Sequence, residues 1–390
     1  MAAIVIVMLP EEGHIVPTFK LAKSLRARGH RVSYLVPQHL ERYVSAQDFE
    51  CLSVSDDFWR TDATGGAPVT DPVERMNAVI YGNRRELVAL LRETALDLLV
   101  VDSYIPTVAL AALEGGIHIT FINVAFDTHR PFALLDSLRQ TTRAGDAALA
   151  ALARVPQIVT YPREFEFAQV LNEGRPLYHV EASVDAGRNE PPFPWEKTDP
   201  AKPLIYCTLG SQCHLFPQSR QFFATVIEAL RSRPDLQLIL SVGKNLSADF
   251  GDVPPNVLVV NWAPQLDILR RAFAMITHGG IGTLKDCIFF AVPMIVFPMM
   301  RDQPMSGARV VYHGLGVRGD MKRVTAEGVR SLIEKVERNP AYAERARAMS
   351  ERFRAAEDEG RGVKIVEKIL GVLERRRPAR PPADLTPSAA

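Results

Sequence analysis

The sequence is poor in cysteine, and its few cysteines are not spaced for metal binding. Four occur among 390 residues, and none forms a Cys-x-x-Cys pair or stands at a zinc-ligand spacing. In a chain of this size, isolated cysteines indicate reduced, mostly buried thiols in a cytoplasmic protein. The four are Cys51, Cys207, Cys213 and Cys287.

Surplus charge and long apolar runs are also lacking. The formal net charge is +1, which gives no reason to expect nucleic acid or an anionic membrane as a partner. The apolar run at 3–9 has no basic segment before it and is too short for a signal peptide or a bilayer span. No other apolar run reaches about 18 residues, so we expect no stable membrane insertion.

The sequence does contain a regular alternation of strand and helix signals. Residues 3–9 form an unbroken apolar run, typical of a strand buried on both faces of a parallel sheet. Residues 16–28 show helical spacing, with Pro17 in the first turn and Gly29 just past the end, and a strand is expected at 32–36. This unit begins a doubly wound fold. Further strands are predicted at 96–101, 118–122, 203–208, 236–242, 256–260, 273–277 and 293–297.

A Pro-rich segment at 189–195 indicates a linker between two such units. With 390 residues, two domains are the natural expectation. We therefore predict an α/β fold of two Rossmann-like domains, at 1–190 and 200–360, each with a doubly wound parallel sheet facing a common cleft. The stretch 325–375 is charged and predicted helical, and the tail at 376–390, rich in Pro, Arg and Ala, is predicted to be disordered.

A glycine-rich turn between a predicted strand and a helix is the most informative stretch. It contains Gly279, Gly280 and Gly282. Glycines let the backbone approach a ligand closely, and the free N–H groups at the start of a helix favour an anion. A diphosphate is therefore the expected ligand, to which His278 can donate a hydrogen bond and Thr283 can offer a hydroxyl.

Two other nucleotide-binding motifs do not account for this turn. The single literal Gly-x-Gly-x-x-Gly copy, at 314–319, opens no strand–helix–strand unit, so we expect it to lie in a loop. The pair Gly243-Lys244 is followed by Asn245 and lacks the upstream glycine of a Walker loop. The sequence therefore predicts neither a dinucleotide site nor a Walker-type site.

Residues on either side of the turn supply the remaining parts of a nucleotide-sugar site. Trp262 follows a predicted strand and offers a flat face for a nucleobase. Asp302 and Gln303 follow another strand and can bond sugar hydroxyls. All lie after the carboxyl ends of strands, where ligands of open α/β sheets bind. Core packing is the alternative for Trp262 alone, but the whole set favours a donor site.

From about residue 203 to 315, this pattern resembles the donor-binding signature of the nucleotide-sugar-dependent glycosyltransferases of the GT-B fold. That family includes plant secondary-metabolite and bacterial antibiotic glycosyltransferases, and a weaker similarity extends to Gly13-His14 and to Asp102. The resemblance implies a UDP- or TDP-sugar as donor substrate and no separate cofactor. It also implies an N-terminal domain that binds the acceptor, a C-terminal domain that binds the donor, and a helix at 361–375 that packs back on the N-terminal domain.

The same resemblance implies a role for each donor-binding residue. Two positions depart from the family pattern, since Asp286 stands where Glu is usual and Ser306 where Asn is common. The implied contacts are Trp262 with the adjoining Ala263 at the base, Gln265 and Asp286 at the ribose, His278, Gly280, Gly282, Thr283, Gly210 and Ser211 at the diphosphate, and Asp302 and Gln303 at the donor sugar.

A His–Asp pair is the predicted catalytic machinery. Transfer to a hydroxyl needs a base, and a histidine of near-neutral pKa suits that task. His14 is expected in the loop after the first strand, and Asp102 follows the strand at 96–101 on the same side of the sheet. An Asp bonded to the imidazole would orient it and stabilise the imidazolium, and the resemblance implies this same pair. The alternative is that both residues merely cap helices.

The sequence contains no Asp-x-Asp motif, so we expect no divalent cation at the diphosphate. Helix N–H groups, His278 and hydroxyls would instead stabilise the charge on the leaving group. Direct attack by the acceptor predicts inversion at the anomeric carbon. The reaction class is therefore a metal-independent, inverting hexosyl transfer, with UDP-glucose as the default donor and TDP-sugars also open.

The acceptor is less defined. Apolar side chains in the segments 57–82 and 124–145 suggest a small hydrophobic natural product, with attack by oxygen or, alternatively, by carbon or nitrogen. Ordinary core packing is the competing explanation for these side chains. Oligomeric state is left open between monomer and homodimer. The predicted acceptor-binding residues are Phe58, Trp59, Met76, Tyr81, Phe126 and Phe132.

Three other functions remain open from the sequence. A nucleotide-sugar epimerase of the same fold would favour carboxylates in the cleft and lack the Trp–Pro–Gln element at 262–265. A non-catalytic subunit should have lost the pair His14 and Asp102. A membrane-associated lipid glycosyltransferase would need a basic and apolar patch, for which Arg84-Arg85 is thin support.

Overall fold

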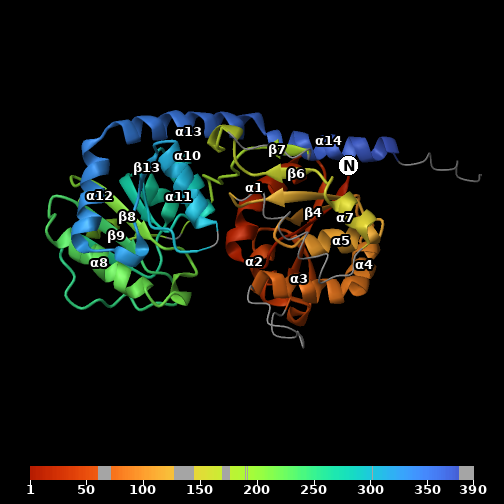
Figure 1. Ribbon diagram of the computed structural model, residues 1–390, viewed down its shortest axis with the longest axis horizontal. Helices are drawn as coiled ribbons and strands as arrows, with labels where there is room; N and C mark the ends of the chain where they lie inside the picture. Colours follow the sequence, from red (N-terminus) through yellow and green to blue (C-terminus); the bar gives the residue numbers. More distant parts are fainter. Residues whose placement is uncertain are drawn as a thin grey trace, which may run out of the picture.

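The structure is a computed structural model with two α/β lobes (Figure 1). It describes residues 1–59, 72–126, 145–168, 176–188, 190, 192–300 and 302–376. Within these ranges, no helix combines the length and apolar character that crossing a bilayer requires. The tail predicted to be disordered at 376–390 lies outside the described part of the chain from residue 377 on, as does the predicted acceptor residue Phe132.

Among the described residues, the first sheet has seven parallel strands in the order β3-β2-β1-β4-β5-β6-β7. Helices cover both faces of this sheet, so its central strands are buried on both sides. Their residues are accordingly almost all apolar. All strands run parallel, but the strand order reverses at the pair β1 and β4: the chain adds β2 and β3 on one side of β1, and β4 to β7 on the other. The loops after β1 and β4 therefore diverge and leave a crevice. The strands are β1 Ala3–Val7, β2 Arg31–Pro37, β3 Glu50–Val54, β4 Leu98–Asp102, β5 Ile119–Asn123, β6 Gln157–Val159 and β7 Leu177–His179.

Helices of the first lobe connect these strands. Helix α1 already begins at Glu12, and so His14 lies in its first turn rather than in the predicted loop, while Pro17 lies inside the helix. The start is early because the N–H groups of His14 and Ile15 bond to the carbonyl of Glu11. The helices are α1 Glu12–Ala27, α2 Gln38–Ser45, α3 Pro72–Gly82, α4 Arg84–Glu93, α5 Pro106–Glu114 and α7 Asp146–Leu152.

The second sheet has six parallel strands in the order β10-β9-β8-β11-β12-β13, with its own reversal between β8 and β11. The strands are β8 Leu204–Thr208, β9 Gln237–Ser241, β10 Val257–Val260, β11 Ala272–Thr277, β12 Met294–Val296 and β13 Gly316–Arg318. The helices are α8 Ser219–Arg231, α9 Gln265–Leu269, α10 Ile281–Phe289, α11 Gln303–Tyr312, α12 Ala326–Arg338, α13 Ala341–Glu359 and α14 Arg361–Arg376.

The predicted α/β class with two doubly wound parallel sheets is confirmed. The prediction of a loop at 314–319 was wrong, because this segment contains the edge strand β13. Gly316 is required there by the close approach of β12, since a Cβ at this position would lie 1.9 Å from the carbonyl oxygen of Met294. A strand of only three residues, in a segment rich in glycine, has too little apolar pattern to be recognised in the sequence.

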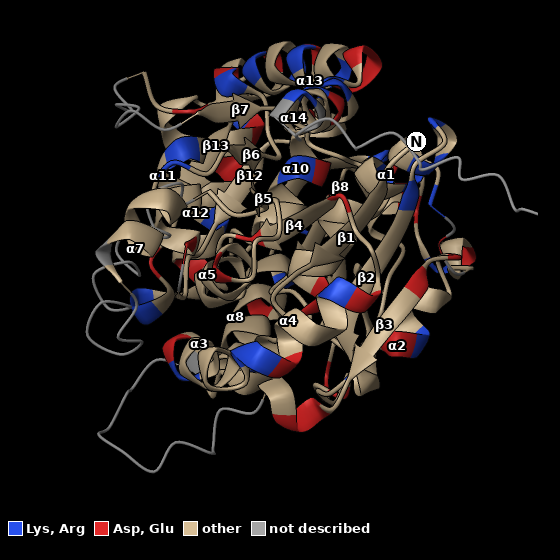
Figure 2. Ribbon diagram, turned by 90° about the vertical axis from the view of Figure 1, so that its right-hand side faces the viewer, with Lys and Arg blue, Asp and Glu red and all other residues tan. Residues whose placement is uncertain are grey.

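The last two helices join the two lobes, with α13 lying along the second lobe and α14 along the first (Figure 1). Gly360, with φ +56°, makes the turn between them. Val366, Ile369 and Leu370 of α14 pack into the apolar cluster that contains Ile4 of β1. Acidic and basic residues are interspersed along α13 and α14 (Figure 2), as expected for helices with a solvent-facing side.

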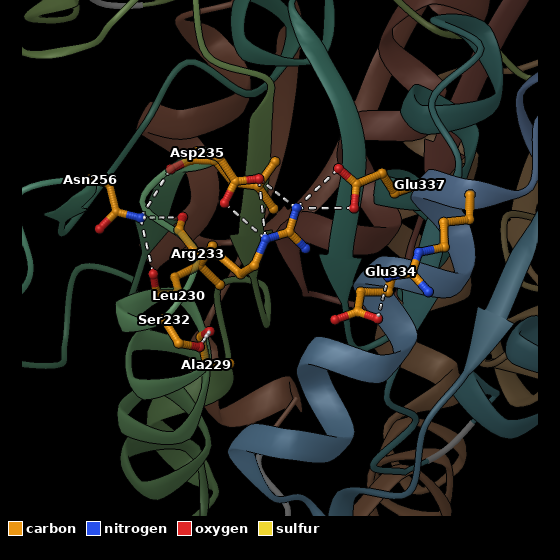
Figure 3. Close-up of polar contacts among 10 residues, drawn as sticks. Ala229, Leu230, Ser232, Arg233, Asp235, Asn256, Glu334 and Glu337 are labelled. Atoms are coloured by element: carbon orange, nitrogen blue, oxygen red, sulfur yellow. Dashed lines mark hydrogen bonds and ion pairs between the residues drawn. The ribbon is translucent and has the colours of Figure 1, made fainter.

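A polar cluster at the end of α8 fastens that helix to the rest of the second lobe (Figure 3). The amide of Asn256 donates to the carbonyl of Leu230 near the end of α8 and to the carbonyls of Arg233 and Leu236 in the segment that follows the helix. Arg233 lies between two carboxylates, with its Nη2 2.7 Å from Asp235 and 3.0 Å from Glu337 of α12.

Candidate functional site

A cleft opens between the carboxyl ends of the two sheets. It consists of two adjoining cavities of about 320 and 450 Å³, within the range of small-molecule sites. The first is lined by residues that follow β1, β4 and β5 on one wall and β8 and β11 on the other. The second extends to the loop after β10. Residues that line both cavities are Glu12, Val16, Arg188, Gly210, Ser211 and Gln265.

His14 and Asp102 are in direct contact on the first wall. The Nδ1 atom of His14 lies 2.7 Å from Oδ2 of Asp102. Asp102 is fully buried at the end of β4, and its oxygens also accept hydrogen bonds from the backbone N–H groups of Leu9 (3.0 Å) and Tyr104 (2.9 Å). Because a carboxylate only accepts hydrogen bonds, Nδ1 carries the proton in the neutral imidazole of His14, and Nε2 then has the free lone pair.

The surroundings of His14 favour its protonated form. Burial by itself lowers the pKa of His14, but the Asp102 carboxylate, its hydrogen bond and the more distant Glu11 and Asp302 outweigh burial and raise the pKa above the ordinary 6.5. Tyr104 packs edge-on against the imidazole at 5.0 Å between ring centres. The sequence-predicted pair therefore has the bonding expected of a base and the carboxylate that orients it.

The predicted phosphate cradle lies on the opposite wall. Helix α10 begins at Ile281, and none of the described side chains caps its first N–H groups, so they remain available to an anion. Gly279 has φ +90°, a conformation that a side chain would oppose. A Cβ on Gly280 would lie 2.6 Å from Nε2 of His278, so the glycine leaves room for that imidazole.

His278 differs from His14 in its ionisation. Burial lowers the pKa of His278 to about 4, so the imidazole is neutral near pH 7 and can donate one hydrogen bond without carrying charge. Gly210, with φ +80°, also packs against this ring. The first cavity thus brings together the predicted residues His14, Gly210, Ser211, Gln265, His278, Gly280, Gly282, Thr283, Asp286, Asp302 and Gln303.

The second cavity contains the predicted base-binding residues. Trp262 is 42% exposed and lines it together with the buried Ala263. Deeper in, Nε2 of Gln265 donates to Asp286 at 2.8 Å. Burial raises the pKa of Asp286, although Arg188 and Gln265 act in the opposite direction.

Two residues of this site were missed in the sequence because they lie at the linker, which Arg188 directly precedes and to which Glu190 belongs. Arg188 donates to Glu190 from Nε at 3.0 Å and to Asp286 from Nη2 at 3.4 Å. Glu190 in turn accepts from the backbone N–H groups of Leu266 (2.9 Å) and Asp267 (3.4 Å) at the start of α9. A Pro-rich linker carries no local pattern that points to a site, so only the folded chain reveals this contact.

The residues predicted for the donor sugar lie at the start of α11. The side-chain oxygen of Gln303 accepts from the N–H groups of Met299 (2.8 Å) and Met300 (3.0 Å), which leaves its NH₂ group for a ligand. Ser306, the departure from the family pattern, is fully buried and its hydroxyl donates to the carbonyl of Asp302 at 3.1 Å.

The five predicted acceptor-binding residues that the structure describes are not brought to this cleft. Phe58, Trp59 and Tyr81 are buried in the apolar core of the first lobe, and Met76 packs against that core. Phe126 is also buried, edge-on against Tyr161. None of these five is among the described residues that line the two cavities, because large aromatic side chains gain more from core packing. The described residues that line the first wall instead include Val16, Pro17, Tyr104, Val124 and Ala125.

Comparisons with known proteins agree with this architecture. Residues 225–368 match the family model described as Erythromycin biosynthesis protein CIII-like, C-terminal domain. An uncharacterized UDP-glucosyltransferase of Bacillus subtilis is 24% identical over 96% of this chain and 98% of its own. Demethyllactenocin mycarosyltransferase of Streptomyces fradiae is 26% identical over 86% of this chain and 79% of its own.

A solved structure, the glycotransferase of kitacinnamycin, superposes with a TM-score of 0.75 at 25% identity, covering 95% of this chain and 99% of its own. The similarity thus spans both lobes and the cleft between them. The resemblance that the sequence indicates is confirmed. The chain is therefore a glycosyltransferase of the GT-B fold, similar across both lobes to glycosyltransferases of natural-product biosynthesis.

Proposed function

We propose that the protein transfers a hexose from a UDP- or TDP-sugar to a hydroxyl of a small hydrophobic natural product, with inversion and without a metal ion. The proposal depends mainly on one observation. His14, whose Nδ1 lies 2.7 Å from Oδ2 of Asp102, lines the same cavity as the start of α10, where no described side chain caps the helix. A base and an anion cradle that share one cavity are the two parts that glycosyl transfer requires.

In the proposed reaction, Nε2 of His14 removes the proton from the acceptor hydroxyl as its oxygen attacks the anomeric carbon. The new carbon–oxygen bond forms on the face opposite the leaving group, while the bond from that carbon to the diphosphate oxygen breaks and the diphosphate takes the electron pair. Asp102 holds the imidazole in the required tautomer and stabilises the imidazolium. The N–H groups of α10 and the neutral His278 donate to the departing diphosphate.

The proposed substrate classes rest on the residues of the cleft and on the relatives. Val16, Tyr104, Val124 and Ala125 give the first wall an apolar surface that suits a hydrophobic acceptor. On the donor side, one relative is named a UDP-glucosyltransferase and another a mycarosyltransferase. We therefore include UDP-glucose and TDP-deoxysugars as donors.

The test is a panel of UDP- and TDP-sugars, screened by thermal shift, followed by mass spectrometry of a set of hydrophobic aglycones with the donor that binds. NMR of the product distinguishes inversion from retention, and we expect a β-linkage from an α-linked donor. Activity should persist in EDTA. A retained α-linkage would reject the single-displacement mechanism, and full release of free sugar without an acceptor would favour the epimerase alternative.

A further inference from the structure

Arg188 extends from the linker between the two lobes into the cleft. Its side chain is 31% exposed and lines both cavities. Among the described residues that line the cavity with the start of α10, it is the one Lys or Arg. It therefore brings positive charge to the part of the cleft where the donor diphosphate is proposed to bind.

Two carboxylates hold the guanidinium in one orientation. Nε donates to Glu190 at 3.0 Å, and Nη2 donates to Asp286 at 3.4 Å. These bonds use two of the five N–H donors of an arginine. Since Arg188 is partly exposed in the cleft, its remaining donors are available to a ligand.

The same two carboxylates also have partners other than Arg188. Glu190 accepts from two backbone N–H groups at the start of α9, and Asp286 accepts from Gln265 at 2.8 Å. Hydrogen bonds from these neutral donors stabilise both carboxylates and help to fix their positions. The guanidinium is thus preorganised, and its remaining N–H donors are accessible from the cleft.

A diphosphate needs more positive charge than the predicted cradle supplies. The start of a helix is equivalent to roughly half an elementary charge, and His278 contributes a hydrogen bond but no charge, since burial lowers its pKa to about 4. Arginine matches phosphate oxygens with paired N–H donors.

We propose that Arg188 binds the diphosphate of the nucleotide-sugar donor and stabilises its charge as it leaves. This assignment rests on the proposed function. It makes the interdomain linker a part of the donor site, so that donor binding depends on a residue outside the C-terminal donor-binding segment predicted from the sequence.

The test compares a nucleoside diphosphate with its uncharged nucleoside, by calorimetry on the full chain. Arg188→Gln should weaken UDP binding by about 10- to 100-fold, the range of a lost charge-assisted hydrogen bond, and leave uridine binding unchanged. Arg188→Lys keeps the charge and should recover part of the loss. TDP and thymidine replace this pair if the protein prefers thymine.

Arg233→Gln is the matched control, because Arg233 also lies between two carboxylates but lines neither cavity (Figure 3). It should change neither affinity. Parallel weakening of UDP and uridine by Arg188→Gln, or unchanged UDP binding, would overturn the diphosphate assignment and leave the proposed function standing. A wild-type protein that binds neither UDP nor TDP would overturn both. If Arg188→Gln fails to fold, the ratio of UDP to uridine affinity in Arg188→Lys decides, and an unchanged ratio counts against the assignment.

Discussion

The two walls of the cleft each present a histidine, but their surroundings give the two imidazoles opposite ionisation. On the wall of the first lobe, the Asp102 carboxylate overcomes burial and raises the pKa of His14. On the wall of the second lobe, burial lowers the pKa of His278 to about 4. The comparison teaches that the role of each histidine follows from its neighbours, because one is prepared to take up a proton and the other to donate a hydrogen bond while neutral.

The difference originates in sheet topology. Strands β1 and β4 are adjacent and parallel, so the residue that ends β4 lies beside the first turn after β1, and Asp102 meets His14. On the other wall, glycines surround His278, and a side chain on Gly210 or Gly280 would collide with its ring. The Asp102 carboxylate makes His14 more basic, whereas burial against closely packed backbone keeps His278 neutral.

The largest effect is expected from removal of the base. His14→Ala should lower kcat by about 10²- to 10⁴-fold, the usual contribution of general base catalysis. UDP affinity should stay unchanged, because the proposed donor contacts lie on the opposite wall. Steady-state kinetics and calorimetry measure the two effects. Substantial turnover by this variant would show that His14 is not the base.

A smaller loss is expected from the residue that orients the base. Asp102→Asn should lower kcat by about 100-fold, because the imidazolium loses its counter-charge and its tautomer is no longer enforced. Since neutral His14 is the active form and its pKa is raised, wild-type activity should fall as pH drops through a value above 6.5. In the variant this acid limb should move to lower pH. An acid limb at the same pH in Asp102→Asn and in the wild type would show that Asp102 does not set the pKa of His14.

The neutral histidine can be disturbed through its glycine neighbour. In Gly280→Ala, the new methyl group would lie 2.6 Å from His278 Nε2, so the imidazole must shift and UDP affinity should fall by roughly tenfold, the equivalent of one neutral hydrogen bond. Gly82→Ala is the control, since a Cβ there meets nothing within 4 Å. Equal UDP affinity in both variants would contradict a role for His278 at the diphosphate.

The smallest effect concerns the contact between the lobes. Lys285 of α10 is buried and donates to the hydroxyl of Thr160 at 2.7 Å, and burial lowers its pKa from 10.5 to about 7. Between these pH values the unfolded chain binds a proton that the folded chain lacks, so the free energy of unfolding should rise with pH from about 7 towards 10.5. Lys285→Met should flatten this rise in urea titrations at pH 7 and pH 9. If the free energy of unfolding rises as steeply with pH in Lys285→Met as in the wild type, groups other than Lys285 cause the rise.

Much of the fold was predictable from local patterns. Continuous apolar runs such as 3–9 and 203–208 correspond to strands β1 and β8, because strands covered on both faces need no polar positions. The edge strand β13 escaped prediction, since its three residues depend on pairing with β12. The start of α1 was also misplaced, and backbone bonds to Glu11 explain why His14 lies within the helix.

The amino-acid order alone determined the predicted phosphate-binding turn. A strand, a glycine turn and a helix start are neighbours along the chain, so the N–H groups at the helix start need no distant segment to be able to face an anion. The tertiary structure decided what depends on distant segments: the contact of His14 with Asp102 across 88 positions, the entry of Arg188 into the cleft, and the burial of Phe58, Trp59 and Tyr81 away from it. The physical reason is that hydrogen bonding at a helix end is local, whereas burial and pairing of charges depend on which segments the fold packs together.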